Sequence, residues 1–292
     1  MARHTSFGVG GPAEGFFTPA TVGLLADFIR WAKKAGVPYR IIGGGTNLLA
    51  SDGGIEGMVI SLKALRDLKA EEGDVGIVTV RAMAGARLQV FCQYAARNGL
   101  EGMNFAVGIP GTIGGGIMMN AGTGGRSMAD ALISVTIMDA NGDVHDIGRE
   151  NFEVGYRSFF WNPCLAASEV PGAVLLAGTF QLRKGRREAR ELRMEARERL
   201  LDRRRKQPIG LPSAGCFFKN PPTGPGAGEL IDRAGLKGRR IGDAEVSTKH
   251  ANFIVNRGNA SSMDILELAG LVQRSVFRKF GTDLEPEVRI IE

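Results

Sequence analysis

The chain has 292 residues, enough for two domains or for one domain with a subdivided core. Apolar residues make up 43% and charged residues 23%, a globular balance that argues against extensive disorder. The net charge of +6 is confined to residues 184–206, which hold eleven Lys/Arg and five Asp/Glu. No CxxC or HExxH-like spacing occurs, so we expect no disulfide framework, no bound metal and a reducing compartment. The three cysteines are Cys92, Cys164 and Cys216.

The N-terminal MARHTSFGVGG lacks the apolar core of a signal peptide. A helix is expected from Thr18-Pro19, by the N-cap and N1 rule, to Gly36. Strands are expected at 39–42, 57–61 and 75–82, and a helix at 88–97 that ends at Asn98-Gly99.

The longest uncharged run, residues 102–125, is long enough to span a bilayer, but it contains nine glycines and a proline. A lipid-exposed helix carries such residues poorly, so we expect a buried loop and no membrane insertion. A hairpin follows with Asn141-Gly142 in its turn, and then a strand at 173–182.

The basic segment 184–206 predicts a helix with an apolar stripe at Ala189, Leu192, Ala196 and Leu200. A solvated connecting helix is favoured over a nucleic-acid surface, because no aromatic residues are interleaved with the basic ones. A third possibility is that one end of the helix faces an anionic small molecule.

The last third predicts helices near 228–235 and 261–280, with strands near 244–247, 252–256 and 287–291. The class is α+β, and no internal repeat is found. Within this part, SAGCFFKNP at 213–221 places a thiol and a cation on either side of two phenylalanines. It is either a buried strand whose cysteine packs as a small hydrophobe or an active-site loop.

Two Gly-rich segments offer bare backbone to a ligand: GGGTN at 43–47 and GIPGTIGGG at 108–116, followed by NAG. Consecutive N–H groups in such turns bind anions, and glycine leaves room for close approach. There is no P-loop and no Rossmann GxGxxG, so two uncharged loops favour a large ligand such as a dinucleotide.

Seven motifs in order carry a family resemblance: HTSFGVGGPA, GGGTNLL, GIPGTIGG with MNAG, YRSF, SAGCFFKNP, KHANFIVN and PEVRII. Together they resemble the UDP-N-acetylenolpyruvoylglucosamine reductase (MurB) family of peptidoglycan synthesis, from about residue 4 to residue 291. The resemblance implies an FAD-binding region of the vanillyl-alcohol-oxidase (PCMH) type at 1–182, in subdomains of about 1–65 and 66–182. A connecting helix at 183–206 and an α+β substrate domain at 207–292 would follow.

The implied activity is NADPH-dependent reduction of UDP-N-acetylglucosamine-enolpyruvate to UDP-N-acetylmuramate, with FAD as cofactor. Since no His or Cys can be assigned to a flavin linkage, we expect the FAD to be non-covalently bound. The N-terminal segment and the Gly-rich run predict a cytoplasmic protein. By the same resemblance Arg157 binds the substrate carboxylate, Cys216 donates the proton and Glu287 stabilises the enol form, with Glu287 on the last strand. Cys216 departs from the family's usual serine. Tyr156, Lys219 and Asn220 are expected near the substrate. The expected cofactor-binding residues are Gly43, Gly44, Gly45, Thr46, Asn47, Leu48, Gly108, Ile109, Gly111, Thr112, Gly115, Asn120, Ala121 and Gly122.

A second departure is that the chain lacks room for the tyrosine-bearing insertion of longer members, and its N-terminus is brief before the first motif. Two alternatives stay open. One is an FAD-dependent alcohol or sugar oxidase of the same fold, and the other is a basic nucleic-acid-binding protein acting through 184–206. We expect no nucleic acid and no obligate protein partner.

Overall fold

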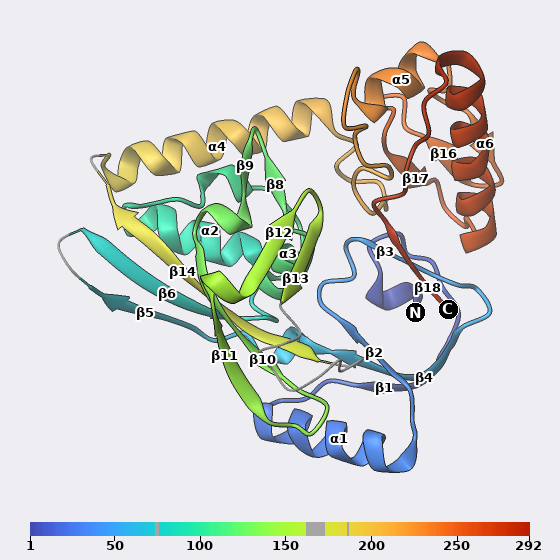
Figure 1. Cartoon of the computed structure of the whole chain (residues 1–292). Helices are drawn as coiled ribbons and strands as arrows, with labels where there is room; N and C mark the ends of the chain where they lie inside the picture. The colour runs from blue at the N-terminus through green and yellow to red at the C-terminus, as the bar shows by residue number, and fades with distance from the viewer. Residues whose placement is uncertain (74–75, 162–172, 186) are drawn as a thin grey trace. The chain divides into compact units, whose positions relative to one another are not determined.

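The computed structural model describes residues 1–73, 76–161, 173–185 and 187–292, and Cys164 lies outside these ranges. The chain forms two compact units (Figure 1). Unit 1 comprises residues 1–14, 45–56 and 202–292, and unit 2 comprises residues 15–44 and 57–201. The domain limits expected from the sequence stay a prediction.

The first helix of unit 2 is α1 (Val22–Ala35), which follows β1 (Ala13–Phe17). The Thr21 hydroxyl accepts a hydrogen bond from Leu24 N at 3.2 Å, and the helix ends at Gly36 with φ 66°. The expected start at Thr18-Pro19 is therefore wrong, because a second threonine three residues later makes the cap. Strand β2 (Tyr39–Ile42) then pairs in parallel with β4 (Ile55–Ser61), as part of a three-stranded sheet in the order β1-β4-β2.

A six-stranded sheet forms the centre of unit 2, in the order β11-β10-β14-β6-β5, with β7 beside β14. Every pairing in it is antiparallel. Its strands are β5 (Leu68–Glu72), β6 (Ile77–Met83), β7 (Leu100–Glu101), β10 (Leu132–Met138), β11 (Val144–Gly148) and β14 (Val174–Lys184). Gly142, at φ 80°, lies in the β10–β11 turn, which confirms the expected hairpin.

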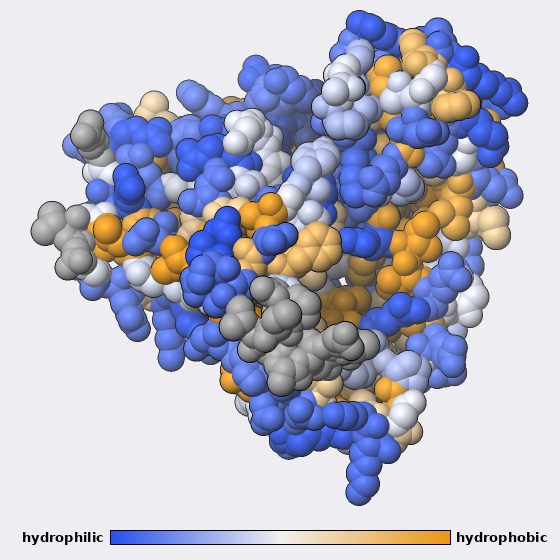
Figure 2. Space-filling view, viewed as in Figure 1, coloured by the Kyte–Doolittle hydropathy of each residue, from blue (hydrophilic) through white to orange (hydrophobic). Residues whose placement is uncertain are grey.

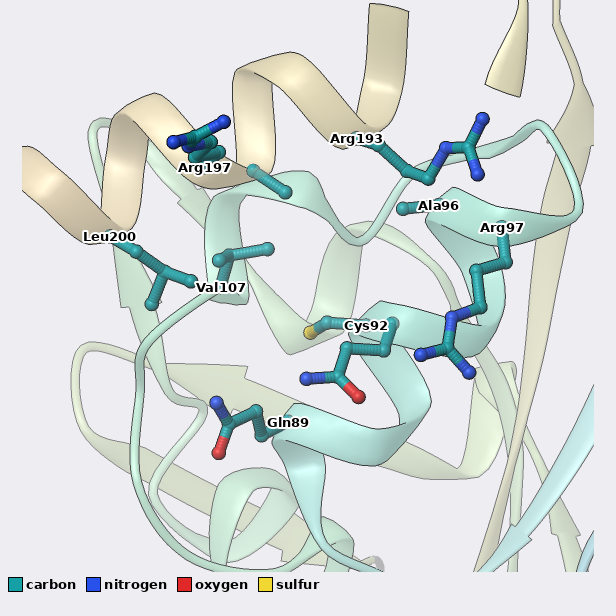
Figure 3. A pocket seen from close by; sticks show the side chains of 10 residues that line it. Gln89, Cys92, Ala96, Arg97, Val107, Arg193, Arg197 and Leu200 are labelled. Carbon is teal, nitrogen blue, oxygen red and sulfur yellow. The ribbon is translucent and has the colours of Figure 1, made fainter. Parts of the chain in front are cut away.

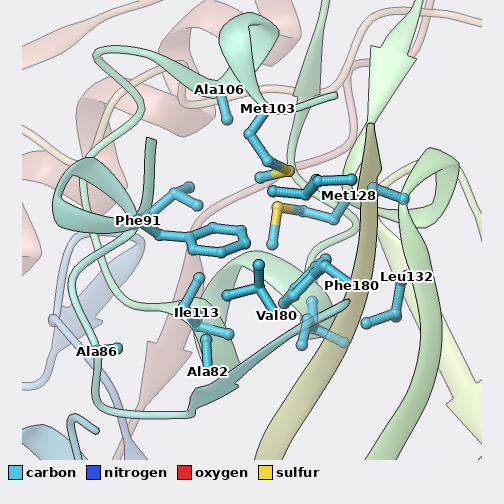
Figure 4. Close-up of a cluster of buried hydrophobic side chains, with 14 of the residues drawn as sticks. Val80, Ala82, Ala86, Phe91, Met103, Ala106, Ile113, Met128, Leu132 and Phe180 are labelled. Atoms are coloured by element: carbon cyan, nitrogen blue, oxygen red, sulfur yellow. The ribbon is translucent and has the colours of Figure 1, made fainter. Parts of the chain in front are cut away.

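The core of unit 2 lies between this sheet and helix α2 (Leu88–Arg97) (Figure 4). The rings of Phe91 on α2 and Phe180 on β14 have centroids 5.0 Å apart. Met103, Ile113 and Met128 complete this apolar contact, and all five side chains are buried. Burial of large apolar side chains is the main source of stability for such a layer.

The Gly-rich run is not the continuous loop that its composition predicts. It contains the 3₁₀ turn η3 (Asn104–Ala106) and helix α3 (Ile113–Met118). A Cβ at Gly114 would lie 2.8 Å from the Ala84 Cβ, so close packing compensates for the low helix propensity of glycine. Strands β8 (Gly122–Thr123) and β9 (Arg126–Ser127) follow.

Helix α4 (Ala189–Lys206) carries the basic segment. Of the expected stripe, Leu192 is buried and Ala196 and Leu200 pack against the core, whereas Ala189 does not belong to that cluster. The surface over this helix is largely hydrophilic (Figure 2). The carboxylate of Glu195 accepts hydrogen bonds from Asn104, Arg187 and Arg199, so α4 is also attached to its unit by polar contacts.

Unit 1 is built from both ends of the chain. Strand β3 (Leu48–Ala50) pairs in parallel with β18 (Arg289–Ile291). A separate sheet contains β15 (Arg240–Ile241), β16 (Ala244–Val246) and β17 (Ile254–Asn256), and β16 packs on α6 (Ser262–Phe280). The unit also holds η1 (Ala2–His4) and α5 (Ala227–Arg233). Phe7, Val9 and Leu49 share one buried cluster with residues of the C-terminal segment.

The remaining elements of unit 2 are the strands β12 (Phe152–Gly155) and β13 (Ser158–Trp161) and three 3₁₀ turns, η2 (Leu62–Ala64), η4 (Met128–Asp130) and η5 (Arg149–Asn151). Among the helices of the described ranges, none has the length and apolarity needed to cross a membrane. The same ranges contain no group of three or more His, Cys, Asp or Glu residues placed to hold a metal ion.

Candidate active site

The segment from Cys216 to Lys219 lies between two other segments of unit 1. On one side, Phe217 N donates to Asn252 O at 2.7 Å, and the backbone of Cys216 forms an isolated antiparallel β-bridge with that of Phe253. On the other side, Glu287 N donates to Phe217 O at 2.8 Å and Lys219 N donates to Glu285 O at 2.8 Å. The backbone of the segment is therefore hydrogen-bonded along both edges.

The side chains of this segment divide by burial. Phe217 and Phe218 are 2% and 1% exposed, whereas Cys216 is half-buried. The two rings lie 5.1 Å apart and anchor the backbone, so the thiol is not needed to fill the core. This arrangement fits a fixed loop that presents a side chain better than a strand packed through its cysteine.

Glu287 is held on the other side of its backbone by Asn47. The Asn47 Nδ2 donates to Glu287 O at 3.0 Å, and Arg289 N donates to Asn47 O at 3.0 Å. The sequence places Glu287 on the last strand, but β18 begins only at Arg289. Pro286 has no N–H to donate, and the Glu287 N–H bonds to Phe217 rather than to β3.

Lys219 and Asn220 both engage neighbouring residues of unit 1. The Lys219 Nζ lies 2.5 Å from Glu285 Oε1, in a pair whose lysine side chain is 25% exposed. The Asn220 Oδ1 accepts from Ala227 N at 3.0 Å, at the start of α5. Both residues follow directly on the Cys216 segment, so their positions depend on the same backbone.

In unit 2, Tyr156 and Arg157 form the two-residue turn between β12 and β13. Arg157 has φ 58°, the left-handed region that side chains other than glycine rarely adopt. Its Nη2 donates to Gly122 O at 3.3 Å, and its guanidinium lies 5.1 Å from the centre of the Tyr156 ring. Backbone strain at a half-buried residue other than glycine is typical of positions under functional constraint.

Asn120 connects this hairpin with the Gly-rich run. Its Nδ2 donates to Gly155 O at 2.9 Å, and its Oδ1 accepts from Ala129 N at 3.1 Å. Asn120 also has a positive φ of 36°. Two strained non-glycine residues, Asn120 and Arg157, are therefore joined through Gly122 and Gly155.

The two Gly-rich loops meet inside unit 2. A Cβ added at Gly43 would lie 2.4 Å from the Thr112 Oγ1, so only glycine allows this approach. Gly108 and Gly111 have φ 81° and 112°, conformations that also favour glycine. The loops thus combine close approach and bare backbone, which is what a bound dinucleotide diphosphate requires.

The predicted site residues divide between the units. Unit 1 contains Gly45, Thr46, Asn47, Leu48, Cys216, Lys219, Asn220 and Glu287. Unit 2 contains Gly43, Gly44, Gly108, Ile109, Gly111, Thr112, Gly115, Asn120, Ala121, Gly122, Tyr156 and Arg157. Sequence reasoning missed Asn252, although it stands in the quoted motif KHANFIVN.

His250 lies two residues before Asn252, and its pKa is shifted. Burial lowers the pKa of His250 from its ordinary value of 6.5, and the charge of Lys237 lowers it further. The Asn252 backbone N–H donates to His250 Nδ1 at 3.3 Å, which requires that nitrogen to be unprotonated. The ring also packs edge-on against Phe253.

The chain is similar to known proteins along its whole length. The profile of the UDP-N-acetylenolpyruvoylglucosamine reductase C-terminal domain matches residues 207–291, and that of an FAD-binding domain matches residues 13–148. The reductase of Desulfosudis oleivorans is 43% identical over 292 residues, which cover 100% of this chain and 92% of that protein. The chain belongs to the UDP-N-acetylenolpyruvoylglucosamine reductase (MurB) family.

A second MurB relative, from Pelobacter propionicus, is 43% identical over 291 residues and is covered to 93%. The crystal structure of MurB from Thermus caldophilus superimposes with a TM-score of 0.79 at 36% identity, covering 100% of this chain and 97% of that one. The expected α+β fold, with a PCMH-type FAD-binding domain and a MurB C-terminal domain, is confirmed. The chain is an enzyme, and family and FAD-binding domain together imply FAD and NADPH as its cofactors.

Proposed function

We propose that the chain reduces the enolpyruvyl ether of UDP-N-acetylglucosamine-enolpyruvate to UDP-N-acetylmuramate, at the expense of NADPH. The observation that carries the proposal is the attachment of Cys216 and Glu287 to one backbone segment. Glu287 N donates to the carbonyl of Phe217, the residue that follows Cys216. A proton donor and a carboxylate are thereby held by the same short piece of unit 1.

The reaction adds a hydride to the methylene carbon and a proton to the adjacent carbon, while NADPH becomes NADP⁺. Bound FAD would supply the hydride after taking it from NADPH. Negative charge develops on the carbon that receives the proton and spreads into the carboxylate, so a fixed cation and a placed acid are needed. The chain offers Arg157 for the first role and Cys216 for the second.

Arg157 suits carboxylate binding because its planar guanidinium presents several donors in a fixed fork. The strained turn and the bond to Gly122 O hold its direction before the substrate arrives. Cys216 would hold the proton on Sγ. An ordinary thiol, with a pKa of about 8.5, is mostly protonated at neutral pH and is a stronger acid than a hydroxyl.

We propose that FAD binds without a covalent link, along the Gly43 and Gly108–Gly122 loops of unit 2. The support is the approach of Gly43 to Thr112 and the glycine-only backbone at Gly108 and Gly111. In those loops, N–H groups would bind the diphosphate. We place the activity in the cytoplasm, in line with the cysteine pattern.

The decisive experiment follows the visible spectrum of the purified protein without oxygen. The protein should be yellow, NADPH should bleach it, and UDP-N-acetylglucosamine-enolpyruvate should restore the colour with formation of UDP-N-acetylmuramate. Acid precipitation should release the flavin. A bleached protein that ignores this substrate but recovers rapidly in air would instead identify an oxidase, and a colourless protein would contradict the proposal.

A further inference from the structure

A pocket of about 230 Å³ lies between α2 and α4, entirely within unit 2 (Figure 3). Its apolar part is formed by Cys92 and Ala96 of α2, by Val107, and by Ala196 and Leu200 of α4. An apolar cavity of roughly 150 Å³ is already enough for benzene. This pocket therefore has room for a short alkyl chain.

Three arginines line the same pocket: Arg97 on α2, and Arg193 and Arg197 on α4. All three are exposed, and the sticks in Figure 3 show them around the pocket rather than in its floor. No acidic residue is among the described residues that line it. Three positive charges thus stand at the edge of an apolar cavity.

The acidic groups of α4 do not neutralise these arginines. Glu195 pairs with Arg187 at 2.9 Å and with Arg199 at 2.8 Å. Within the ranges that the structure describes, no ion pair involves Arg97, Arg193 or Arg197. Like charges at i and i+4, as at Arg193 and Arg197, repel each other on a helix.

We propose that this pocket binds a small amphiphilic anion, with an alkyl chain among the apolar side chains and a carboxylate at the arginines. The apolar surface favours the chain, and the uncompensated charge favours the anionic head. An alkyl chain alone would leave the arginines without a partner in the ligand, and an anion alone would leave the apolar cavity unfilled. The proposal goes beyond the reductase reaction, because none of the residues proposed for catalysis lines the pocket.

The pocket lies next to the Gly-rich loop, because its lining residue Val107 directly precedes Gly108. An occupant would contact the residue at the start of a loop that is proposed to bind FAD. Binding of the anion can be measured directly, so the test does not depend on the reductase activity.

The test is isothermal titration of the whole protein with octanoate, with 1-octanol as the uncharged match and sulfate as the match without a chain. Octanoate should bind at least about tenfold more tightly than either, since a charge-assisted hydrogen bond is worth a factor of that order. Equal or weaker binding of octanoate would overturn the proposal. So would tighter binding of a single-stranded oligonucleotide at the same arginines, which would identify a nucleic-acid surface.

Variants locate the site. Arg193→Gln with Arg197→Gln should weaken octanoate binding at least about tenfold and leave 1-octanol unchanged. Arg190→Gln is the control, because it removes an exposed arginine of α4 that does not line the pocket. Ala196→Phe should weaken both octanoate and 1-octanol by filling the cavity. Octanoate binding that survives the double arginine change, in protein with unchanged circular dichroism, would contradict the assignment.

Discussion

The carboxamide of Asn252 pairs with both backbone polar groups of Phe218. Phe218 N donates to Asn252 Oδ1 at 3.0 Å, and Asn252 Nδ2 donates to Phe218 O at 2.8 Å. Both residues are buried. The side chain thus takes the place of a neighbouring strand and holds the segment that carries Cys216.

Replacement of Asn252 tests this role. Asn252→Ala leaves two buried backbone groups unpaired, so the free energy of unfolding should fall by about 2–4 kcal/mol. The turnover number should fall as well, because Cys216 loses its support, while NADPH still bleaches the flavin. Urea denaturation and the two half-reactions measure these effects.

The matched control is Asn259→Ala, which removes an exposed asparagine of the same unit. It should change neither quantity. If Asn252→Ala lowered stability but left the turnover number of the folded protein intact, the positioning role would be wrong.

Cys216 can be tested with two substitutions of different chemistry. Cys216→Ser should keep substantial turnover, because serine also donates a proton. Cys216→Ala should lose about 10²–10⁴ of it, the usual contribution of a positioned general acid. NADPH should reduce the flavin in both variants. Near-normal turnover in the alanine variant would remove Cys216 from the mechanism.

Arg157 offers a separation of stability from function. Arg157→Gly should be more stable than Arg157→Ala by about 1 kcal/mol, because glycine adopts the left-handed conformation without a Cβ clash. Both variants should slow flavin reoxidation by the enolpyruvyl substrate by about 10²–10³, the typical effect of losing one preorganised donor. Equal slowing of the NADPH step would indicate a purely structural role.

Gly43 tests the loop contact that is proposed to accommodate FAD. In Gly43→Ala the new Cβ would meet the Thr112 hydroxyl at 2.4 Å, so the two loops must separate. The dissociation constant of FAD should rise at least about tenfold, since a loss of about 1.4 kcal/mol in binding free energy changes the affinity by that factor. Gly23→Ala is the control, because its Cβ would have 3.8 Å to the nearest atom. Equal FAD affinity in the two variants would count against the loop contact.

His250 predicts a pH dependence of stability. Because burial lowers its pKa below 6.5 in the folded protein, the unfolded chain binds this proton more readily. Well above pH 6.5 the His250 ring is neutral in both states, so it makes no pH-dependent contribution to the free energy of unfolding. As the pH falls below 6.5, the unfolded chain takes up the proton first and the folded state becomes less stable. The stability of the wild type should therefore decline relative to His250→Asn between pH 7.5 and pH 5.5. A difference that stays constant over this range would refute the prediction.

Local patterns in the sequence located five of the six α-helices but only nine of the eighteen strands in the part of the chain that the structure describes. The limits of α2 match the expected helix, and α6 begins where Ser261 caps it through Asp264 N. Such signals depend on residues within one turn of each other, so they can be read without the fold. Helix α3 was missed because its three glycines argue against a helix, and contact with Ala84 compensates only in the folded protein.

The geometry of the candidate site depends instead on residues distant in sequence. Asn47 reaches Glu287 across 240 positions, and Asn252 reaches Phe218 across 34. The motifs named the segments that carry the proposed chemistry, but no local pattern indicates which backbone group an asparagine side chain will bind. That choice follows from tertiary packing, which explains why Asn252 was not singled out.

The pairing of β3 with β18 has a consequence for biosynthesis. Residues 48–50 are synthesised long before residues 289–291. Strand β3 therefore stays without its partner until the residues of β18 have been synthesised. The side chains of Phe7, Val9 and Leu49 stay exposed as well, because the residues that bury them belong to the C-terminal segment. A polypeptide that ends before the C-terminal segment would leave these apolar side chains exposed, and exposed apolar segments promote aggregation.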